Sequence, residues 1–480
     1  MPKEKQLAER EIMREMVSDL MRDGVTRRLF LKGTAAAGLL AAMGTTGCSG
    51  IKSSDAKGKI VIIGAGAAGL SMAVRLKSKL KNAQITLIDP AERQYYQPGF
   101  TLIAAGVYQP DVVWKLQKDL IPSDLNWIKQ AVVAVDPDKR LVTMADGKSV
   151  NYDFLVLTPG IQLNYSAIEG ITEETLGVGN AHSIYCFEGA KKTCAAMKEF
   201  AKKGGVGIFT DTYTKHKCGG APKKVCLLTE HQMRKNGTRD KGTFKYFTGS
   251  KALYDVPHFT PRLVEIYKER NIPVTVKSHI TGVDTAAKKV HLVKLEKYTE
   301  EVKNPQTGAM EKVEKTREVK FTESYDFLHF APPQSAPDFV KKSGLSWRQG
   351  KYARDGWVEV DKYTLVHKVY PNVISLGDVA GIPTSKTSAA ARIQIPIAEK
   401  NLISLMDGKA PTAKYNGYAA CPIVVDYGHV ILAEFDYDKK PQISFPFSLL
   451  DMSKEQRAAW WLKVYVLKPL FFYGMLKGLA

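Results

Sequence analysis

The order of apolar and polar positions predicts strands that alternate with helices along most of the chain. Residues 59–63 form a continuous apolar run, which is typical of a buried parallel strand, and residues 70–80 place apolar side chains at helical spacing. A second apolar run covers residues 84–88, and two later runs end at Thr158 and at Gly377. This alternation predicts an α/β fold built on parallel sheets.

The turn after the first strand has the glycine pattern of a dinucleotide site. Gly64 permits a tight turn, Gly66 lets the backbone approach a pyrophosphate, and Gly69 lets helix and strand pack closely. The second strand ends at Asp89, about 25 residues further on, where a carboxylate accepts hydrogen bonds from a ribose diol. Strand, turn and helix together predict a dinucleotide-binding domain in which the helix N-terminus faces the phosphates.

The later strand ends favour a flavin over a nicotinamide. Thr158 and Gly160 follow one apolar run, and Gly377 and Asp378 follow another, where the carboxylate can hold a ribityl hydroxyl. This layout resembles the two-dinucleotide-domain flavoproteins, in which an inserted second domain holds NADH on a glycine motif of its own. The corresponding strand here, residues 206–209, is followed by Thr-Asp-Thr-Tyr, so a nicotinamide partner is disfavoured.

One cysteine lies in a setting that favours its thiolate. Cys218 precedes a predicted helix that begins at Pro222 and that Asn236 and Gly237 close. Four lysines lie close by in sequence, namely Lys215, Lys217, Lys223 and Lys224. A helix N-terminus and positive charge both stabilise a thiolate, so the pattern indicates a reactive thiol. The alternative is a turn cysteine beside a solvated lysine face.

The other cysteines carry weaker signals. Cys194 and Cys226 fall on the apolar faces of predicted helices, which is typical of core packing. Cys421 precedes Pro422 at the entrance to a strand and is also interpreted as packing. Cys186 lies in a connecting segment before a helix, and its role stays open.

The composition is that of a globular protein of two or three domains, with 480 residues, 44% of them hydrophobic and 25% charged. Six cysteines without a C-x-x-C pair exclude a disulfide scaffold and a structural zinc site, and no metal is expected. The net charge of +20 favours anionic partners. Because no nucleic-acid module or stacked aromatic pattern accompanies the charge, nucleic acid is not expected as a partner.

The N-terminus resembles an export signal. Paired arginines within residues 26–32 stand directly before a mildly apolar run at 33–47 that is too short to span a bilayer. This pattern is typical of the twin-arginine route, with an amphipathic surface helix as the alternative. It predicts a periplasmic protein that takes up its cofactor before export. Cys48 is a weaker candidate for lipid attachment, because no Leu or Val stands three residues before it.

The C-terminal segment has the composition of a membrane-surface element. Residues 460–473 are apolar and aromatic, and Lys463, Lys468 and Pro469 interrupt them. Trp and Tyr favour the water–lipid boundary, so the segment is predicted to lie in a membrane surface rather than to span it. Packing on the protein's own core or in a dimer interface is the alternative.

Residues 294–322 are charged and predict an exposed hairpin.

Five motifs together resemble the mitochondrial-like branch of the sulfide:quinone oxidoreductases. They are residues 95–98 (Tyr-Tyr-Gln-Pro), 217–222 (Lys-Cys-Gly-Gly-Ala-Pro), 383–387 (Pro-Thr-Ser-Lys-Thr), 415–418 (Tyr-Asn-Gly-Tyr) and 430–437 (Val-Ile-Leu-Ala-Glu-Phe-Asp-Tyr). The resemblance covers nearly everything after residue 57. It implies FAD in the first domain, a sulfur-handling cysteine on one side of the isoalloxazine, and a quinone on the other side near a membrane-dipping C-terminus.

The resemblance also implies roles for single residues. Cys218 matches the sulfur-transferring cysteine beside the flavin, and Gly377 and Asp378 match the flavin-contacting pair. Lys386 lies in the segment beside the flavin, and Gln97, in the first of the five motifs, is taken as a cofactor-binding residue.

The chain departs from the family at Val379, where this branch has its second redox cysteine. The family's reaction opens a sulfur bridge between two cysteines with sulfide, which leaves one cysteine as a persulfide while the other thiolate attacks the flavin. Valine can do neither. Other branches carry a further cysteine in a segment similar to residues 182–186. The hypothesis is that Cys186 either replaces the missing partner of Cys218 or lies by the flavin and bonds to it.

The predicted architecture has two Rossmann-like dinucleotide-binding domains, the second inserted in the first, and a C-terminal membrane-associating lobe. The predicted ranges are 1–50 for signal and linker, 57–165 with 330–408 for the FAD domain, 166–329 for the second domain carrying Cys218, and 409–480 for the lobe.

The predicted reaction is oxidation of sulfide to a persulfide or polysulfide, with electrons passing through FAD to a membrane quinone. Cys218 would hold the sulfur, while Lys386 would attract hydrosulfide and stabilise reduced flavin. Two alternatives stay open. One is the flavoprotein subunit of an exported sulfide dehydrogenase that donates to a c-type cytochrome, and the other is a flavin-binding sulfur carrier without sulfide oxidation. A homo-oligomer also stays open.

Overall fold

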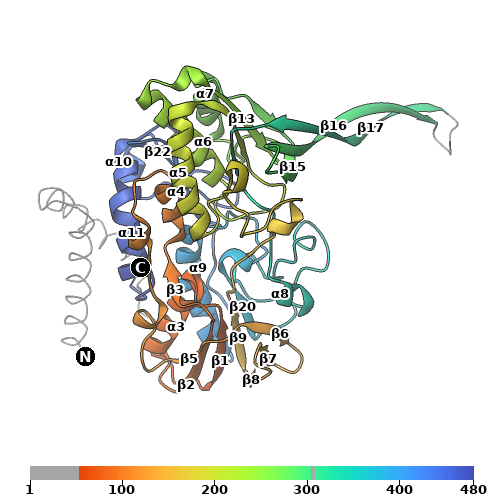
Figure 1. Ribbon diagram of the computed structural model, residues 1–480. Helices are drawn as coiled ribbons and strands as arrows, with labels where there is room; N and C mark the ends of the chain where they lie inside the picture. The colour runs from red at the N-terminus through yellow and green to blue at the C-terminus, as the bar shows by residue number, and fades with distance from the viewer. Residues whose placement is uncertain (1–52, 304–305, 307–308, 480) are drawn as a thin grey trace, which may run out of the picture.

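The computed structural model describes residues 53–303, 306 and 309–479, so the predicted export signal and Cys48 lie outside the described residues. The first of two parallel sheets lies at the bottom of Figure 1. Its strands, in spatial order, are β20 (Val373–Ser375), β9 (Phe154–Leu157), β1 (Gly58–Ile63), β2 (Ala83–Ile88) and β5 (Asn126–Ile128). Residues 60–63 of β1 are at most 2% exposed, because a parallel sheet of this kind is covered on both faces.

Two long helices pack against each other and against the first sheet. α3 (Ala67–Lys79) follows the glycine turn and packs against α9 (Ser388–Met406). Arg75 and Lys79 of α3 both form ion pairs with Glu399 of α9, whose side chain is fully buried. A buried carboxylate requires such partners, so the two helices are fixed to each other by charge as well as by packing.

The second parallel sheet carries the helices at the top of Figure 1. Its strands, in spatial order, are β11 (Ala181–His182), β18 (Phe327–Phe330), β12 (Gly205–Thr210), β13 (Gly242–Thr248) and β14 (Val274–Val276). Its helices are α5 (Phe187–Lys203), α6 (Ala221–Asn236) and α7 (Thr260–Glu269). Two such sheets confirm the predicted α/β fold with two Rossmann-like units.

Smaller elements connect and extend the two sheets. β10 (Gln162–Leu163) pairs antiparallel with β19 (Gln334–Ser335) where the chain leaves and re-enters the first unit. The remaining short elements are β3 (Arg93–Tyr95), β4 (Trp114–Leu116), β6 (Val132–Asp136), β7 (Leu141–Met144), β8 (Ser149–Asn151), α4 (Phe100–Ala104) and α8 (Asp338–Lys342).

An antiparallel ribbon projects from the second unit, as Figure 1 shows. β15 (Ser278–Asp284) pairs with β16 (Lys289–Lys303), which pairs with β17 (Met310–Ser324). The outer parts of β16 and β17 are largely exposed, so the predicted exposed hairpin is confirmed.

The C-terminal segment packs on the body of the protein. The hairpin of β21 (Ala419–Asp426) and β22 (His429–Phe435) lies against α6, and α10 (Arg457–Trp461), a π-helical turn (Leu462–Val466), α11 (Leu467–Pro469) and a second π-helical turn (Leu470–Met475) follow. Phe471 and Phe472 join the core of the first sheet, and Lys463 and Lys468 are buried. The segment therefore follows the alternative packing on the protein's own core over much of its length. Among the described residues, no helix has the length and apolar character that crossing a membrane requires.

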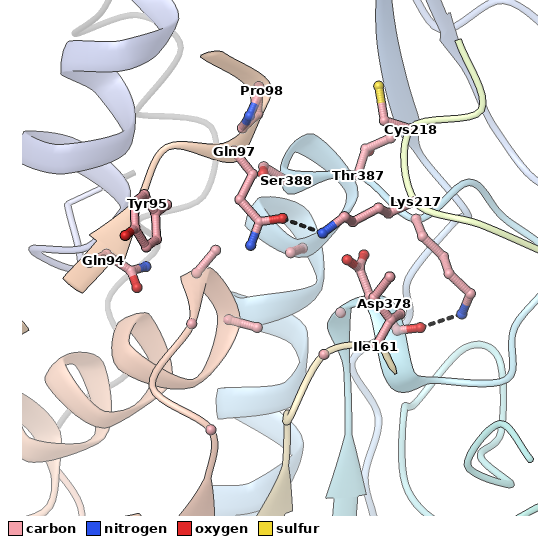
Figure 2. Close-up of a pocket in the computed structure, with 18 of the residues that line it drawn as sticks. Gln94, Tyr95, Gln97, Pro98, Ile161, Lys217, Cys218, Asp378, Thr387 and Ser388 are labelled. Atoms are coloured by element: carbon pink, nitrogen blue, oxygen red, sulfur yellow. Dashed lines mark hydrogen bonds between the residues drawn. The ribbon is translucent and has the colours of Figure 1, made fainter. Parts of the chain in front are cut away.

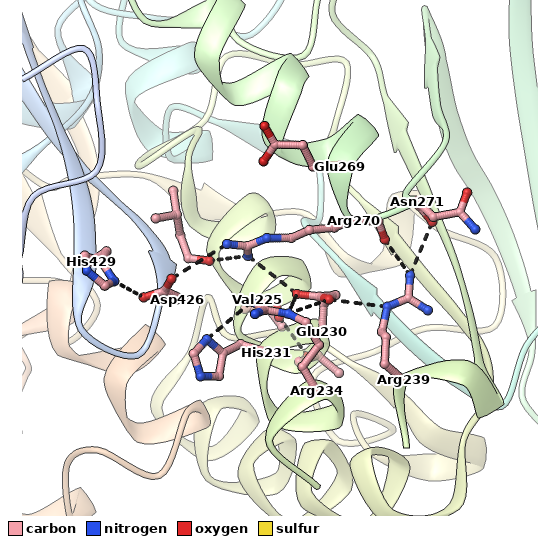
Figure 3. A network of polar contacts seen from close by, with 12 residues as sticks. Val225, Glu230, His231, Arg234, Arg239, Glu269, Arg270, Asn271, Asp426 and His429 are labelled. Carbon is pink, nitrogen blue, oxygen red and sulfur yellow. Dashed lines mark hydrogen bonds and ion pairs between the residues drawn. The ribbon is translucent and has the colours of Figure 1, made fainter. Parts of the chain in front are cut away.

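A buried charge network joins the C-terminal hairpin to the second unit (Figure 3). Glu230 of α6 is 1% exposed and accepts a hydrogen bond from Arg234 at 2.9 Å. It also pairs with Arg239 at 3.3 Å and with Arg270 at 3.5 Å. Arg270, which follows α7, reaches Asp426 at the end of β21 at 3.7 Å. Glu230 therefore connects α6 to the end of α7, and Arg270 connects that end to the hairpin, so the network holds β21 beside α6.

Candidate active site

A cavity of about 390 Å³ opens at the carboxyl ends of β1, β9 and β20. Ligands bind at this edge in open α/β sheets. The loop before α6 and Phe471 of the C-terminal segment complete the wall. Its lining includes most of the predicted site residues, namely Gly64, Gly66, Asp89, Gln97, Thr158, Gly160, Gly377, Asp378, Lys386 and Cys218. Figure 2 shows how several of these side chains gather around one space.

The glycine turn fits a pyrophosphate. Gly64 has φ of +91°, and an added Cβ would lie 2.4 Å from the Thr158 carbonyl oxygen. At Gly69 a Cβ would lie 1.8 Å from the Gly64 carbonyl oxygen, so this glycine allows helix and strand to approach. At Gly66 a Cβ would meet no described atom within 4 Å, because this residue faces the cavity at the start of α3. The backbone is therefore open to a ligand where the helix N-terminus begins.

The polar residues beside the turn also suit a dinucleotide. Asp89 Oδ2 accepts a hydrogen bond from the Ala65 N–H at 2.6 Å, which fixes the turn against β2. Thr158 Oγ1 donates to the Ile63 carbonyl at 2.8 Å. Gln117 Nε2 donates to the Ala65 carbonyl at 2.9 Å, while its buried Oε1 has no hydrogen-bond partner in the described part of the chain. An acceptor left unpaired in the wall of a cavity points to a ligand that donates to it.

A polar pair spans the cavity from two distant segments. Lys217 Nζ donates to Gln97 Oε1 at 2.6 Å, as Figure 2 shows. Asp378 faces the same space, and burial raises the pKa of its carboxyl, although Lys386 and Lys217 oppose this. The Gly377 N–H donates to Gln394 Oε1 at 2.8 Å, which fixes the turn that presents Asp378.

Lys386 lies beneath the loop that carries Cys218. Its Nζ donates to the backbone carbonyls of Asp378 and Ala380 and lies 3.7 Å from the centre of the Trp357 ring. Burial is the main reason why the pKa of Lys386 falls to about 7. Small changes in pH near neutrality therefore change the charge of Lys386 in this cavity.

Cys218 lies at the edge of the cavity, and positively charged lysine side chains lie close to its thiol. The residue has φ of +49°, and its loop leads into α6 after Gly220, as the sequence predicts. Lys224 Nζ donates to Cys218 Sγ at 3.4 Å. A hydrogen bond from the Cys421 thiol, together with the charges of Lys224 and Lys463, holds the pKa of Cys218 well below its usual range despite burial. In Figure 2 its sulfur is directed away from Asp378.

Cys421 is the functional candidate that sequence reasoning missed. The interpretation of Cys421 as simple packing is incomplete, because its thiol contacts the thiol of Cys218. That hydrogen bond and burial raise the pKa of Cys421 well above its usual value. The two residues are far apart in sequence, and only the docking of β21 on α6 brings them together. No local pattern around Cys421 signals this contact.

The structure places Cys186 elsewhere. Its Sγ accepts a hydrogen bond from the Gly189 N–H at 3.4 Å at the start of α5, and burial raises its pKa. Ile184 and Tyr185 line the cavity, whereas Cys186 packs beside the core under β11 and β18. The structure thus brings Cys218 together with Cys421 and not with Cys186. Val379 is fully buried in the core of the first sheet.

The end of β12, where a second dinucleotide would bind in related folds, is closed by a buried ion pair. Asp211 Oδ2 accepts hydrogen bonds from Lys223 Nζ at 2.7 Å and from Thr248 Oγ1 at 2.9 Å. Both charged side chains are at most 4% exposed. The pair fixes the end of β12 to the first turn of α6, and Lys223 Nζ also donates to the Gly219 carbonyl at 3.0 Å, which supports the loop that carries Cys218.

Strand order, glycine turn and a thiol beside the cavity together define a dinucleotide-binding oxidoreductase of two Rossmann-like units. The family model "Pyridine nucleotide-disulphide oxidoreductase" matches residues 58–194, which include the glycine turn. The mitochondrial sulfide:quinone oxidoreductase of Mus musculus is 34% identical over 420 residues, which is 88% of this chain and 86% of that protein. The corresponding protein of Dictyostelium discoideum is 36% identical over 421 residues, again 88% and 86%. The chain belongs to the sulfide:quinone oxidoreductase family, and it is an oxidoreductase.

A solved structure shows the same fold. The sulfide:quinone oxidoreductase of Aquifex aeolicus matches with a TM-score of 0.65 at 20% identity, over 84% of this chain and 88% of that chain. The match covers most of both chains, so the two proteins share the overall fold.

The predicted periplasmic location and twin-arginine export are wrong. The curated relatives that cover most of the chain are mitochondrial proteins by name. The prediction was wrong because the sequence pattern on which it rests is short. Paired arginines before a mildly apolar run do not distinguish an export signal from a basic amphipathic segment.

Proposed function

We propose that this protein oxidises sulfide to a persulfide or polysulfide with bound FAD and passes the electrons to a quinone. The observation that carries the proposal is the position of Cys218, which lies in the wall of the cavity and accepts a hydrogen bond from Lys224 Nζ at 3.4 Å. A thiolate is the form of cysteine that attacks and leaves in sulfur exchange, so the site is prepared for sulfur chemistry near neutral pH.

The residues that would hold FAD follow from the cavity. Gly66 and the start of α3 would receive the pyrophosphate, and Asp89 and Gln117 would accept hydrogen bonds from hydroxyl groups. Thr158, Gly160, Gly377 and Asp378 would line the flavin end. When bound, FAD supplies a two-electron acceptor that can pass electrons on singly or in pairs.

The lysines of the site would bring an anionic substrate to Cys218. Lys217 lies beside Cys218 in the chain and reaches into the cavity, and Lys386 lies below it. Lys224 donates directly to the sulfur. Positive charge in a partly enclosed site raises the local concentration of hydrosulfide and stabilises a thiolate leaving group.

The C-terminal segment would provide the quinone end. Phe471 lines the cavity, and Tyr96 packs against it with ring centres 5.4 Å apart. Leu449 and Phe445 are 75% and 59% exposed in the loop before α10. Exposed apolar side chains of this kind are suited to a lipid surface, from which a quinone would enter.

An anaerobic reduction experiment tests the proposal. The flavin-loaded protein is mixed with sulfide, the flavin absorbance is followed, and a quinone analogue or a cytochrome c is then added. Bleaching by sulfide and recovery on quinone addition support the proposed reaction. Absence of bleaching would contradict sulfide oxidation, and recovery with cytochrome c alone would contradict the quinone as acceptor.

A further inference from the structure

The antiparallel ribbon of β16 and β17 ends in a free sheet edge. The sheet order is β15, β16 and β17, so β17 has no neighbour on its outer side among the described strands. β15 pairs with β16 only as far as Lys294, which lies opposite Val319 of β17. Beyond this point the ribbon has two strands and extends away from both parallel sheets (Figure 1). Because two strands without a covering layer are marginally stable in water, a partner strand would stabilise this part of the fold.

β17 lacks the backbone features that usually protect a free edge. The strand is 15 residues long and contains neither proline nor glycine, and its described residues pair with β16 without a bulge. Residues 310–318 are all exposed, so neither face of this stretch is covered. Short strands, prolines and bulges normally prevent an edge from pairing with another chain. The unpaired N–H and C=O groups along the outer half of β17 are therefore open to a further strand.

The charges of β17 suit an antiparallel copy of the same edge. Only alternate residues direct their backbone groups outward, so the two-fold axis of such a pair must pass beside a residue and not between two residues. An axis at Val313 places this residue opposite its own copy and Lys312 opposite Glu314 of the second chain. The same axis places Glu311 opposite Lys315. The pair thus contains four contacts between opposite charges, which stabilise a sheet at directly opposed positions.

Most other axes bring like charges together. From residue 311 to residue 318, an axis at any of the charged residues sets that charge against its own copy. An axis at Thr316 sets Lys315 opposite Arg317. Like charges at directly opposed positions destabilise a sheet. The sequence of the edge therefore selects the register as well as the partner.

The room around the ribbon separates the axis at Val313 from one at Val319, which also pairs opposite charges. Val319 lies opposite Lys294, where β15 still belongs to the sheet and the body of the protein is close. Val313 lies six residues further out, which is about 20 Å along a strand. With the axis at Val313, the two bodies lie on opposite sides of the axis and stay apart.

The outer edge of β16 is less suited to such pairing. An axis at Thr299 sets Lys297 opposite Glu301, which gives two contacts between opposite charges instead of four. An axis at Glu300 sets this charge against its own copy. The edge of β17 is therefore the better template for a second copy.

We propose that two copies of this chain associate through the outer edge of β17, antiparallel about Val313, and form a four-stranded sheet. The interface is isologous, so it closes at two copies. Because it is small and rich in charge, the dimer dissociates on dilution and at high salt. None of the described ribbon residues lines the cavity, so the proposal does not depend on the proposed function.

Cysteine trapping tests the register. The flavin-loaded Val313→Cys protein is oxidised with copper phenanthroline and run on a non-reducing gel. We expect a band at twice the mass of the chain, which dithiothreitol removes. Thr316→Cys is the matched control on the same strand, because its two copies would lie six residues apart, about 20 Å, which is beyond the reach of a disulfide. The unsubstituted protein gives the background from the native cysteines.

Three results of this trapping would overturn the proposal. One is a dimer band for Val313→Cys that is no stronger than that for Thr316→Cys. Another is a stronger band for Thr299→Cys than for Val313→Cys, which would place the contact on β16. The third is a ladder of higher multiples, since a contact that closes at two copies cannot extend.

A charge exchange tests the partner contact without a cross-link. Glu314→Lys sets like charges opposite each other at Lys312 of the second chain, so the dissociation constant measured by analytical ultracentrifugation should rise about tenfold. Adding Lys312→Glu restores opposite charges and should return the constant to within about threefold of the original. The double variant disturbs the ribbon itself more, because Glu314 pairs with Lys297 and Lys312 lies opposite Glu301. Recovery therefore comes only from the partner.

The sedimentation data also decide against the proposal in two cases. Equal constants for the single and the double variant would exclude the register at Val313, and an unsubstituted protein that stays monomeric at all concentrations would exclude the dimer. Bleaching of the flavin by sulfide is measured in parallel. It should be equal in all these proteins, so that a failure of sulfide oxidation is distinguished from a failure of association.

Discussion

The backbone N–H of Cys218 donates to the backbone carbonyl of Lys386 at 3.0 Å. This bond ties the loop before α6, which belongs to the second unit, to the segment after β20, which belongs to the first. Lys386 in turn donates its side chain to the carbonyls of Asp378 and Ala380. The loop that carries the Cys218 thiol is therefore positioned by the same residue whose side-chain amine lies under the cavity.

The buried ammonium of Lys386 predicts a pH-dependent stability difference. Its pKa of about 7 in the folded protein lies below the ordinary value of 10.5, mainly because of burial. The cost of burying the cation is fully present below about pH 7 and disappears as pH rises towards 10.5. The wild-type protein should therefore gain roughly 2 to 3 kcal/mol relative to Lys386→Met between about pH 6 and pH 9.

Denaturant unfolding of the flavin-free proteins at several pH values measures this difference. Lys362→Met, which changes a partly exposed lysine, is the control and should show no such trend. A constant difference between wild type and Lys386→Met over this pH range would mean that Lys386 stays charged.

We expect Asp89 to determine how strongly the protein retains its cofactor. Its two oxygens accept the N–H groups of Ala65 at 2.6 Å and Ala91 at 2.7 Å. In Asp89→Asn an amide N–H₂ would face one of these donors, so the glycine turn loses a hydrogen bond worth about 1 to 3 kcal/mol when left unmade. We expect the flavin content after gel filtration to fall at least about fivefold. Asp124→Asn, which changes an exposed ion pair with Lys77, should retain the flavin.

The first unit was predictable because its signals are local. The strand at 59–63, the glycine turn and Asp89 lie within one short stretch, and steric contacts at Gly64 and Gly69 require the residues that the pattern names. The helix after Cys218 was predictable for the same reason, since Pro222 and Gly237 mark its two ends. Each of these inferences depends on neighbours in the chain.

The partner of Cys218 was not predictable in this way. Its contact with Cys421 depends on how a hairpin docks on α6, and on the network of Glu230 and Arg270 that fixes this docking. Likewise, the aromatic C-terminal segment suggests a lipid surface by composition alone, although Phe471 and Phe472 find their apolar environment in the protein core. Composition indicates which environment a side chain favours, but not whether the protein core or a lipid surface provides that environment.

We expect Glu230 to stabilise the docking of the β21–β22 hairpin on α6. Its carboxylate is 1% exposed and lies among Arg234, Arg239 and Arg270. Glu230→Gln leaves the partly buried charges of Arg239 and Arg270 without their carboxylate, so the cost should lie near the lower end of the roughly 3 to 5 kcal/mol that a buried pair costs to break. The midpoint of chemical denaturation should fall accordingly. Glu199→Gln, which changes an exposed pair with Lys203, should move it little, and equal shifts for both variants would contradict the role of the network.

Lys224 predicts the reactivity of Cys218 towards alkylating agents. The hydrogen bond from Cys421 and then the charge of Lys224 lower the pKa of Cys218, so the thiolate persists below the pH at which an ordinary cysteine is protonated. Lys224→Met should slow alkylation of peptide 218–223 by iodoacetamide at about pH 6.5 by roughly tenfold, with recovery at higher pH. Lys235→Met, at the exposed end of α6, should leave the pH profile unchanged. Equal profiles for all three proteins would exclude Lys224 as the source of the shift.

Two adjacent glycines give the sharpest test of the contact between the sulfurs. A Cβ at Gly220 would lie 2.7 Å from Cys421 Sγ, whereas at Gly219 the nearest described atom, His216 Nε2, would be 3.5 Å away. Gly220→Ala should therefore displace Cys421, remove its hydrogen bond to Cys218 and slow alkylation of Cys218 at about pH 6.5, while Gly219→Ala should not. Peptide mapping with mass spectrometry measures both rates. If the two substitutions slowed alkylation equally, the low pKa of Cys218 would have to come from the loop itself rather than from Cys421.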